Sequence, residues 1–479
     1  MIRGRLSYKY VVAAVFVAGL FMDILDTTIV NVALPTLGRE FHASTSSIEW
    51  VVVGYLLSLA VWIPASGWIG DRIGTKRTFL FALAMFTLAS ALCGQARSLT
   101  ELVVFRVFQG VGGGMLTPVG TAMLFRAFPP AERARASTIL IVPTVLAPAT
   151  GPVLGGLLVD KASWRWIFYV NLPIGVAAFI FGALFLHEHK EHTAGRFDVP
   201  GFVLSGGGLA LVLFALSQGP THGWGSAEVL LTGVGGILAF VALVKVELRI
   251  AQPMLQLRLF RDRMFRTANL ASLFSYAGFA GLLFLLPLFL QQLRGLSALQ
   301  SGLTTFPQAF GVMISSQIVG RLYPRIGPRR LMVGGLAGSA VTVTLFLFVD
   351  LNTNLWWIRG LMFTRGICMA FAFVPLQAAT YTTISSSDTG RASALYSTQR
   401  QVAAALGVAA LATVLASQAT HISGLAPKAG LSAFHTAFAA SAGLALLGSL
   451  AALLVRDEDA ASTMRPRMKY PETEPAAVA

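Results

Sequence analysis

Charged side chains are scarce in this sequence. Only 12% of its 479 residues are Asp, Glu, Lys or Arg, whereas 55% are hydrophobic. A soluble protein carries about twice that charged fraction, so the composition excludes a soluble globular domain. The apolar segments are too long for the strands of a membrane barrel and indicate an all-α integral membrane protein instead.

Cysteine and metal-binding patterns are also nearly absent. Cys93 and Cys368 lie far apart inside apolar segments, so we expect them to pack as small apolar residues. The tract His187–His192 lacks the zinc spacing His-Glu-x-x-His and is interpreted as a solvated loop. Gly110–Gly114 lies inside an apolar segment, outside the strand–turn–helix context of a phosphate loop. No metal, cofactor or ATP is therefore expected.

Fourteen apolar segments, separated by Pro, Gly and charge, are predicted to be transmembrane helices. Their expected bounds are 10–34, 49–69, 79–96, 99–122, 136–159, 165–186, 198–217, 227–247, 266–291, 302–322, 331–349, 356–378, 391–417 and 433–455. The first segment is longer than a signal peptide core and contains acids, so we expect it to be retained as a span. An even number of spans places both termini on the same side.

The net charge of +15 is concentrated on one predicted side of the membrane. Of the 36 Lys and Arg residues, 26 fall in the two terminal segments and the loops of that side, against 7 in the opposite loops. Positively charged loops stay in the cytoplasm, so both termini are predicted to be cytoplasmic, in an inner or plasma membrane. This placement indicates contact with anionic lipid and gives no reason to expect nucleic acid.

The chain also contains an internal repeat. Gly67–Arg77 and Gly320–Arg330 lie 253 residues apart and match at Arg72/Arg325, Gly74/Gly327 and Arg77/Arg330, with Pro324 in place of Asp71. The repeat predicts two six-helix bundles related by a pseudo-twofold axis, with a substrate site near the midplane between them. The expected parts are a bundle over 1–190, two additional helices over 191–250, a bundle over 251–456 and a disordered cytoplasmic tail over 457–479.

Two carboxylates, Asp23 and Asp26, lie three residues apart in the first predicted helix. Each ionised Asp at a helix centre costs about 2.5–3.5 kcal/mol in a bilayer, which favours an ion or substrate site; a fixed ion pair is the alternative. Arg106 in the fourth predicted helix is the expected partner. Our hypothesis is that Asp26, with or without Asp23, exchanges a proton for substrate while Arg106 tunes it. Asn31 and Gln109 are further candidates for the cavity wall.

Several of these segments resemble motifs of one family. Gly67–Arg77 is similar to the cytoplasmic signature loop of the major facilitator superfamily. Leu25–Pro35 resembles the first-helix motif of its fourteen-helix drug:proton antiporters, the EmrB/QacA-like multidrug exporters. Arg106–Gly110, Ala147–Gly156 and Trp164–Gly175 resemble the fourth-helix arginine motif, the fifth-helix antiporter motif and a further motif of that branch. The resemblance implies alternating-access export coupled to protons, with an acid at the position of Asp26.

The signature loop is expected to gate the cytoplasmic side through Gly67, Asp71, Arg72, Gly74 and Arg77. Glycines permit a tight turn between closely packed helices, while the Asp can cap a helix N-terminus and the Arg residues can bridge carboxylates. The alternative is a plain positive loop that only sets topology.

The expected antiporter motif consists of Gly151, Pro152, Gly155 and Gly156. The proline predicts a kink, and the last two glycines predict close packing against a partner helix.

The sequence as a whole predicts a proton-coupled exporter of lipophilic, cationic compounds. Export of an endogenous lipid or metabolite is the alternative. A membrane-embedded enzyme or receptor would require clustered His, Glu or Cys ligands or a catalytic triad, which the sequence does not contain. The expected partners are lipophilic small molecules, membrane lipid and, in a cell with two membranes, a periplasmic adaptor protein.

Overall fold

A computed structural model describes residues 7–43, 45–191, 197–250, 253–419 and 427–464, which are almost entirely helical. The helices of the first part of the chain are α1 (Tyr8–Glu40), α2 (Thr45–Ile73), α3 (Thr75–Gln95), α4 (Leu99–Ala127), α5 (Arg133–Lys161), α6 (Trp166–Tyr169) and α7 (Asn171–Phe185). The middle holds α8 (Val199–His222) and α9 (Ala227–Arg249). The remainder is α10 (Arg263–Leu288), α11 (Ala298–Thr305), α12 (Pro307–Ile326), α13 (Pro328–Thr344), α14 (Leu355–Thr380), α15 (Thr389–Ala419) and α16 (Pro427–Ala452).

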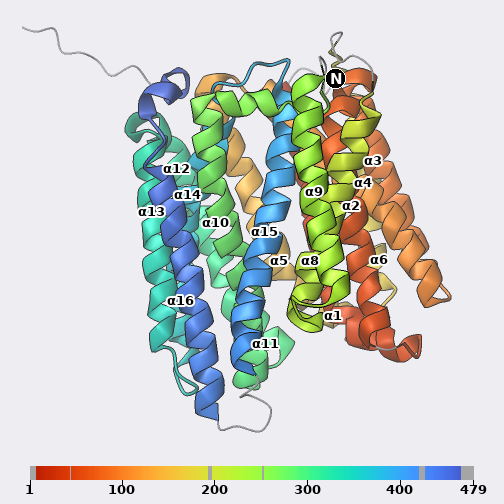
Figure 1. The fold of residues 1–479 in the computed structure, drawn as a ribbon, viewed down its shortest axis with the longest axis vertical. Coiled ribbons are helices and arrows are strands. Elements are labelled where there is room, and N and C mark those ends of the chain that lie inside the picture. The colour runs from red at the N-terminus through yellow and green to blue at the C-terminus, as the bar shows by residue number, and fades with distance from the viewer. Residues whose placement is uncertain (1–6, 44, 192–196, 251–252, 420–426, 465–479) are drawn as a thin grey trace, which may run out of the picture.

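Eleven helices in the described residues are long and apolar enough to cross a membrane, or twelve if the bent helix α5 is one span. This confirms the all-helical membrane fold. The two other predicted spans correspond to α12 and α15, which are less apolar and do not meet the same test. Arg321 and Arg325 lie near the end of α12, and Arg391 and Arg400 lie in the first half of α15. Figure 1 nevertheless shows α15 running through the height of the helical body. The count of fourteen spans stays a prediction.

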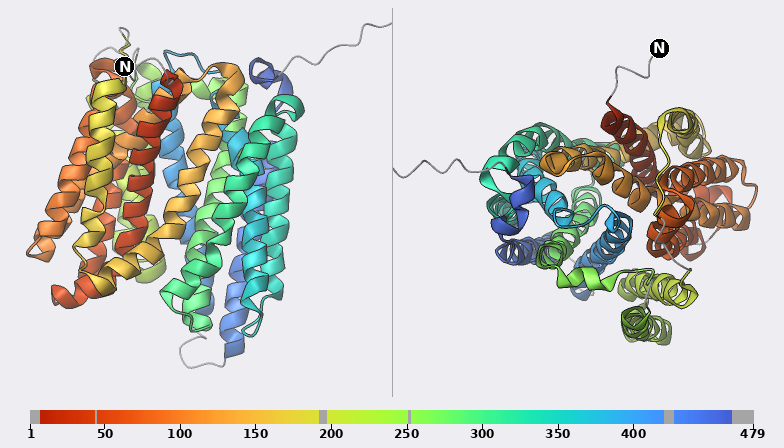
Figure 2. Two further views of the ribbon diagram at one scale, coloured as in Figure 1. Left: turned by 180° about the vertical axis from the view of Figure 1, so that it is seen from behind. Right: turned by 90° about the horizontal axis from the view of Figure 1, so that it is seen from above.

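The helices gather in two groups with α8 and α9 beside them (Figures 1 and 2). Helices α1 to α7 form one group, and α10 to α16 form the other. Contacts between the groups run along α2 with α15 and along α5 with α12. Helix α8 packs against α2 and α15, and α9 packs on α8. We call the end of the body where α1 begins the Tyr8 end and the opposite end the Glu40 end.

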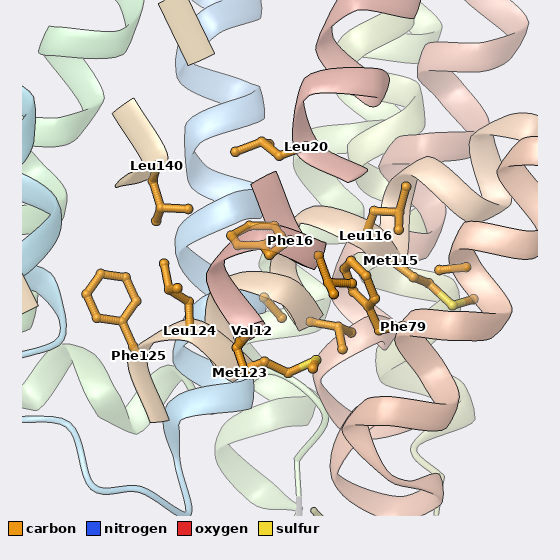
Figure 3. Close-up of a cluster of buried hydrophobic side chains, with 14 of the residues drawn as sticks. Val12, Phe16, Leu20, Phe79, Met115, Leu116, Met123, Leu124, Phe125 and Leu140 are labelled. Carbon is orange, nitrogen blue, oxygen red and sulfur yellow. The ribbon is translucent and has the colours of Figure 1, made fainter. Parts of the chain in front are cut away.

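Helix α1 is fixed in place by an apolar core that it shares with α3 and α4 (Figure 3). Phe16 lies edge-on to Phe79 of α3, with ring centroids 6.3 Å apart, and Leu116 of α4 belongs to the same cluster. Phe16 precedes Asp23 by seven residues, or about two helical turns, so this packing also orients the carboxylate-bearing part of α1.

The internal repeat is visible in the two turns at the Tyr8 end. Gly74 and Gly327 both have positive φ, at +118° and +90°, which only glycine adopts without strain. An acid caps the helix that follows each turn: Glu188 accepts a bond from the Lys76 amide at 3.0 Å, and Asp457 accepts one from the Arg329 amide at 2.9 Å. Glu188, from the tract that resembled a metal site, therefore has a capping contact.

The tail predicted to be disordered from residue 457 is ordered at its start. Asp457–Thr463 form a 3-10 helix, and the hydroxyls of Thr463 and Tyr323 lie 3.0 Å apart. The prediction was wrong for this segment because the Asp457 cap and the buried Tyr323 contact hold it against α12 and α13. Residues 465–479 lie outside the described part of the chain.

Candidate functional site

Asp26 lies in a fully buried network of polar side chains. It forms the predicted ion pair with Arg106 of α4, and both side chains have no exposed surface. Its other oxygen accepts hydrogen bonds from Gln109 at 2.9 Å and Asn171 at 3.1 Å. Arg106 also donates to the Val51 carbonyl at 3.0 Å, so the pair links α1, α2, α4 and α7.

Asp23 has different surroundings, although it lies only one turn earlier on α1. It accepts hydrogen bonds from the Tyr55 hydroxyl at 2.5 Å and the Thr117 hydroxyl at 3.3 Å. Among the described residues, no Lys or Arg nitrogen forms a salt bridge with it within 4.0 Å. Tyr55 connects the two acids because the Arg106 guanidinium lies 4.1 Å from the centroid of its ring.

Asp23 lines a central cavity of about 270 Å³ between the two helix groups. On the other wall are Tyr276 of α10 and both Arg400 and Gln401 of α15. The rest of the wall is mainly apolar and includes Leu56, Leu59, Ile63 and Phe279. A wall of this kind suits a small amphiphilic molecule, because apolar surface holds its body while a few polar groups orient it.

An outer cavity of about 410 Å³ continues from the central cavity toward the Glu40 end. The two share Thr28 and Pro148 on their walls, and Asn31 lines the outer one. Gln109, the second predicted wall residue, is instead fully buried in the Asp26 network. The prediction failed for Gln109 because its helix face turns toward α1 rather than toward the space between the groups.

Two arginines face these cavities from the second helix group. Arg365 lines the outer cavity and donates a hydrogen bond to the Gln308 side chain at 2.5 Å. The guanidinium of Arg400 lies 5.6 Å from the ring centroid of Tyr276. Neither forms a salt bridge within the described part of the chain. The cavities therefore have a carboxylate on one wall and guanidinium groups on the other.

The cavities are closed at the Tyr8 end, where α2 and α4 contact α15. Gly67 lies so near α15 that a Cβ placed on it would be 2.8 Å from the Gly390 carbonyl oxygen. Ser393 donates a hydrogen bond to the Pro118 carbonyl at 2.7 Å. These contacts close the central cavity toward the Tyr8 end, whereas the outer cavity extends toward the Glu40 end.

Asp71 of the signature loop lies at the N-terminal end of α15. A Cβ built on Gly390 would be 2.7 Å from its Oδ1 atom. Asp71 accepts a hydrogen bond from Arg126 at 2.9 Å, and Arg126 also donates to the Ser386 carbonyl at 3.0 Å in the other helix group. These contacts place the signature loop against the second helix group, α10 to α16.

The other predicted loop residues lie nearer the surface. Arg77 is exposed, and its Nε atom lies 3.6 Å from a Glu188 oxygen. Arg72 is also exposed. Gly74 supplies the turn into α3.

Helix α5 bends by 41° between Pro148 and Val153, where Gly151 and Pro152 predicted a kink. Gly151 packs closely on α1, since a Cβ there would lie 2.8 Å from the Cβ of Thr28. Gly155 is buried, but a Cβ on Gly156 would meet nothing within 4 Å. The predicted close packing is therefore wrong for Gly156, which faces away from the neighbouring helices.

Three residues of the site were not predicted: Tyr55, Thr117 and Asn171. Each is a single polar residue in an apolar helix, a weak signal that many packing residues share. Among the described residues, no group of three His, Cys, Asp or Glu side chains is placed to hold a metal ion.

Comparisons with known proteins identify the family. The chain matches the model of the Major Facilitator Superfamily over residues 16–408 and 268–474. It is 35% identical over 414 residues to the multidrug resistance protein B homolog of Mycobacterium tuberculosis, covering 85% of this chain and 76% of the relative. It is also 35% identical over 393 residues to the putative multidrug resistance protein MdtD of Pectobacterium atrosepticum, covering 81% and 84%.

A solved structure supports the fold. The crystal structure of the human organic anion transporter MFSD10 (TETRAN) superposes with a TM-score of 0.68 at 16% identity, covering 93% of this chain and 99% of that one. At that identity the likeness concerns the fold alone. Together with the sequence matches, it shows that the chain is a multi-pass membrane transporter, not an enzyme, that belongs to the major facilitator superfamily and is similar to its multidrug resistance proteins.

Proposed function

We propose that this transporter exports lipophilic, cationic compounds in exchange for protons by alternating access. The observation that carries the proposal is the position of Asp23, a carboxylate on the wall of an otherwise mainly apolar cavity. Its hydrogen-bond donors are the hydroxyls of Tyr55 and Thr117. A desolvated carboxylate that forms no salt bridge with a described residue gains from binding either a proton or a substrate cation.

Asp23 and Asp26 have separate roles in this proposal. A proton and a substrate cation compete for Asp23, so that loading one releases the other. Asp26 is already neutralised by Arg106 and satisfied by Gln109 and Asn171, which favours a positioning role. The sequence-based hypothesis assigned the exchange to Asp26. The cavity wall favours Asp23 instead, and separate variants decide between them.

Tyr55 offers a route by which the state of Asp23 reaches Asp26. Its hydroxyl donates to Asp23, and its ring lies against the Arg106 guanidinium. When a proton neutralises Asp23, the short bond from Tyr55 weakens and the ring is free to shift relative to Arg106. The packing of α1, α2 and α4 around Arg106 then responds to proton or substrate loading.

We further propose that the two helix groups are six-helix bundles, 1–190 and 251–456, that rock against each other across fourteen spans. Helix α15 would be a polar span because it lines the central cavity, and α12 would be the second span below the apolar threshold. The Tyr8 end would face the cytoplasm, as the positive loops indicate. A body that is closed there and hollow at the Glu40 end corresponds to an outward-facing state, from which substrate leaves and protons enter.

A second candidate is export of an endogenous lipid or metabolite with an anionic group. Arg365 and Arg400 favour it, since both face the cavities without a carboxylate partner in the described residues. The two candidates differ in the charge of the transported molecule and in the residue that binds it.

Efflux from proteoliposomes tests the proposal, with ethidium as the cation and a pH gradient as the driving force. A charge-assisted hydrogen bond contributes about 1.5–3 kcal/mol, so Asp23→Asn should reduce proton-driven efflux roughly ten- to hundredfold. Asp23→Glu should retain a part of it. Asp350→Asn, the same substitution at an exposed position, is the matched control.

Asp26→Asn is measured in parallel. If proton-driven efflux of cations survives in Asp23→Asn but not in Asp26→Asn, Asp26 rather than Asp23 exchanges the proton for substrate. Movement of anionic lipid without ethidium efflux in the unaltered protein would favour the second candidate.

A further inference from the structure

A third cavity lies beside the central one, between α2, α8 and α15. This side pocket has a volume of about 530 Å³. Four residues line both it and the central cavity: Thr27, Leu56, Gln401 and Ala404. Since the two spaces share these four residues, the side pocket is directly adjacent to the cavity that contains Asp23.

The side pocket is apolar and its shape follows from the sequences of two helices. Helix α15 presents small side chains on one face, including Ala405, Ala409 and Ala412. Leu213 and Leu216 of α8 stand on the opposite wall. Alanines facing leucines across a helix contact leave space that larger side chains would fill. Protein interiors are otherwise close-packed, so an apolar space of this size suits an apolar ligand.

We propose that the side pocket binds the alkyl chain of an amphiphilic substrate whose cationic head group lies at Asp23. This inference rests on the proposed function and specifies its substrate class. Thr27 follows Asp23 by one helical turn on the same face of α1 and lines both cavities. A chain attached to a head group at Asp23 therefore reaches the side pocket past Thr27.

The assignment also gives α8 a role. Leu213, Leu216 and Pro220 of this helix form the wall that completes the pocket, with α2 and α15 supplying the rest. Without α8, the apolar faces of α2 and α15 at this position would lack that wall. The additional helix thus extends the substrate site rather than only adding a membrane anchor. An acyl chain of a membrane lipid has the same chemistry and is the competing occupant.

The test is competition against ethidium efflux by alkyltrimethylammonium ions of increasing chain length, in proteoliposomes of one lipid composition. Ala409→Phe fills the side pocket and does not touch the central cavity wall. Ala410→Phe makes the same change at the next residue, which is exposed and lies outside the pocket. Partition of the chains into the bilayer is equal in all samples, so the difference between the two variants isolates the pocket.

Each methylene that enters an apolar pocket from water gains about fourfold in affinity. We expect the unaltered protein and Ala410→Phe to show potency that rises with chain length from hexyl to dodecyl. In Ala409→Phe the rise in potency should stop at a chain at least two methylenes shorter. The potency of the longest chain should therefore be lower by about tenfold or more than in the unaltered protein. Leu213→Ala, which enlarges the pocket, should extend the rise to longer chains.

Failure of the inference is distinguishable from failure of the proposed function. Absence of ethidium efflux in the unaltered protein would remove the proposed function. Normal efflux with the same dependence on chain length in Ala409→Phe and Ala410→Phe would overturn the side-pocket assignment alone. The potency of the alkyltrimethylammonium ions could also rise with chain length no more steeply than their partition into the bilayer in every sample. If the purified protein then retains a lipid, the pocket is assigned to membrane lipid and the side-pocket assignment is overturned.

Discussion

Neutralising Asp71 is expected to weaken the closed Tyr8 end. The Asp71 side chain is buried at the N-terminal end of α15, against Gly390, and accepts a bond from Arg126. A carboxylate at a helix N-terminus contributes about 0.3–1 kcal/mol when exposed and up to about 2 kcal/mol when partly buried. Asp71→Asn removes the charge and preserves the shape, so it isolates this electrostatic contribution.

The magnitude depends on which contacts break when the helix groups separate. Asp71 and Arg126 belong to the same group, on α2 and α4, so their ion pair can persist in both states. The contact of Asp71 with α15 exists only in the closed state. Its loss is expected to cost about 1–2 kcal/mol, which raises the population open at the Tyr8 end about five- to thirtyfold.

Thiol labelling measures that population. Ser393 is fully buried where α15 meets α4, and its hydroxyl bonds to the Pro118 carbonyl. In a background without Cys93 and Cys368, Ser393→Cys should react only when the groups separate. If opening is fast compared with labelling, the rate follows the open population. Asp71→Asn should therefore raise the labelling rate of Ser393→Cys by the same five- to thirtyfold. This increase corresponds to a free-energy change of about 1–2 kcal/mol.

Two controls make the result decisive. Ser449→Cys lies inside the second helix group, where the serine bonds to the Val333 carbonyl of α13 at 3.1 Å, and its labelling should not change. Asp71→Glu preserves the charge and should have a smaller effect. The reasoning is refuted if Asp71→Asn leaves the labelling of Ser393→Cys unchanged. Equal acceleration at Ser449→Cys would also refute it, because general loosening would then explain the result.

Two further predictions concern stability, measured as thermal unfolding in detergent. Gly110→Ala should destabilise the protein by about 1–3 kcal/mol, because its Cβ would lie 2.6 Å from the Tyr55 carbonyl oxygen. Gly207→Ala, with nothing within 4 Å, should have no such effect, and equal effects would contradict the close helix contact. Asn171→Leu should cost about 1–3 kcal/mol, because a buried Asp26 oxygen loses a donor. That cost should shrink in an Asp26→Leu background, and an unchanged cost would show that the bond to Asp26 is unimportant.

The sequence predicted the ion pair between Asp26 and Arg106 for a general physical reason. A charge inside a membrane has to find a partner, and few were available in the first half of the chain. A buried charge alone would allow Arg106 to pair with either acid, and Asp26 was preferred because Leu25–Pro35 resembles the first-helix motif. Side chains three residues apart on a helix point in directions about 60° apart. The packing of α1 decides which of the two acids faces the cavity. It turns Asp26 toward α4 and α7 and Asp23 toward the cavity.

Packing against distant helices also explains the predictions that failed. Gln109 and Gly156 lie in motifs whose residue types fit a cavity wall and a close helix contact. Their helix faces turn elsewhere, Gln109 into the buried network and Gly156 into open space. The start of the tail is ordered because Asp457 caps a turn more than a hundred residues away in the chain. None of these outcomes is visible in local sequence.

By itself, the sequence determined the class of the protein and the positions of its helices, because a bilayer requires long apolar segments with internally satisfied backbones. It also determined the glycine turns at Gly74 and Gly327, since a positive φ depends on the residue type. Only the tertiary structure decided which carboxylate faces the cavity and that α8 and α15 enclose a side pocket. Those features arise between helices far apart in the chain, whose relative rotation depends on the sum of many weak packing contacts.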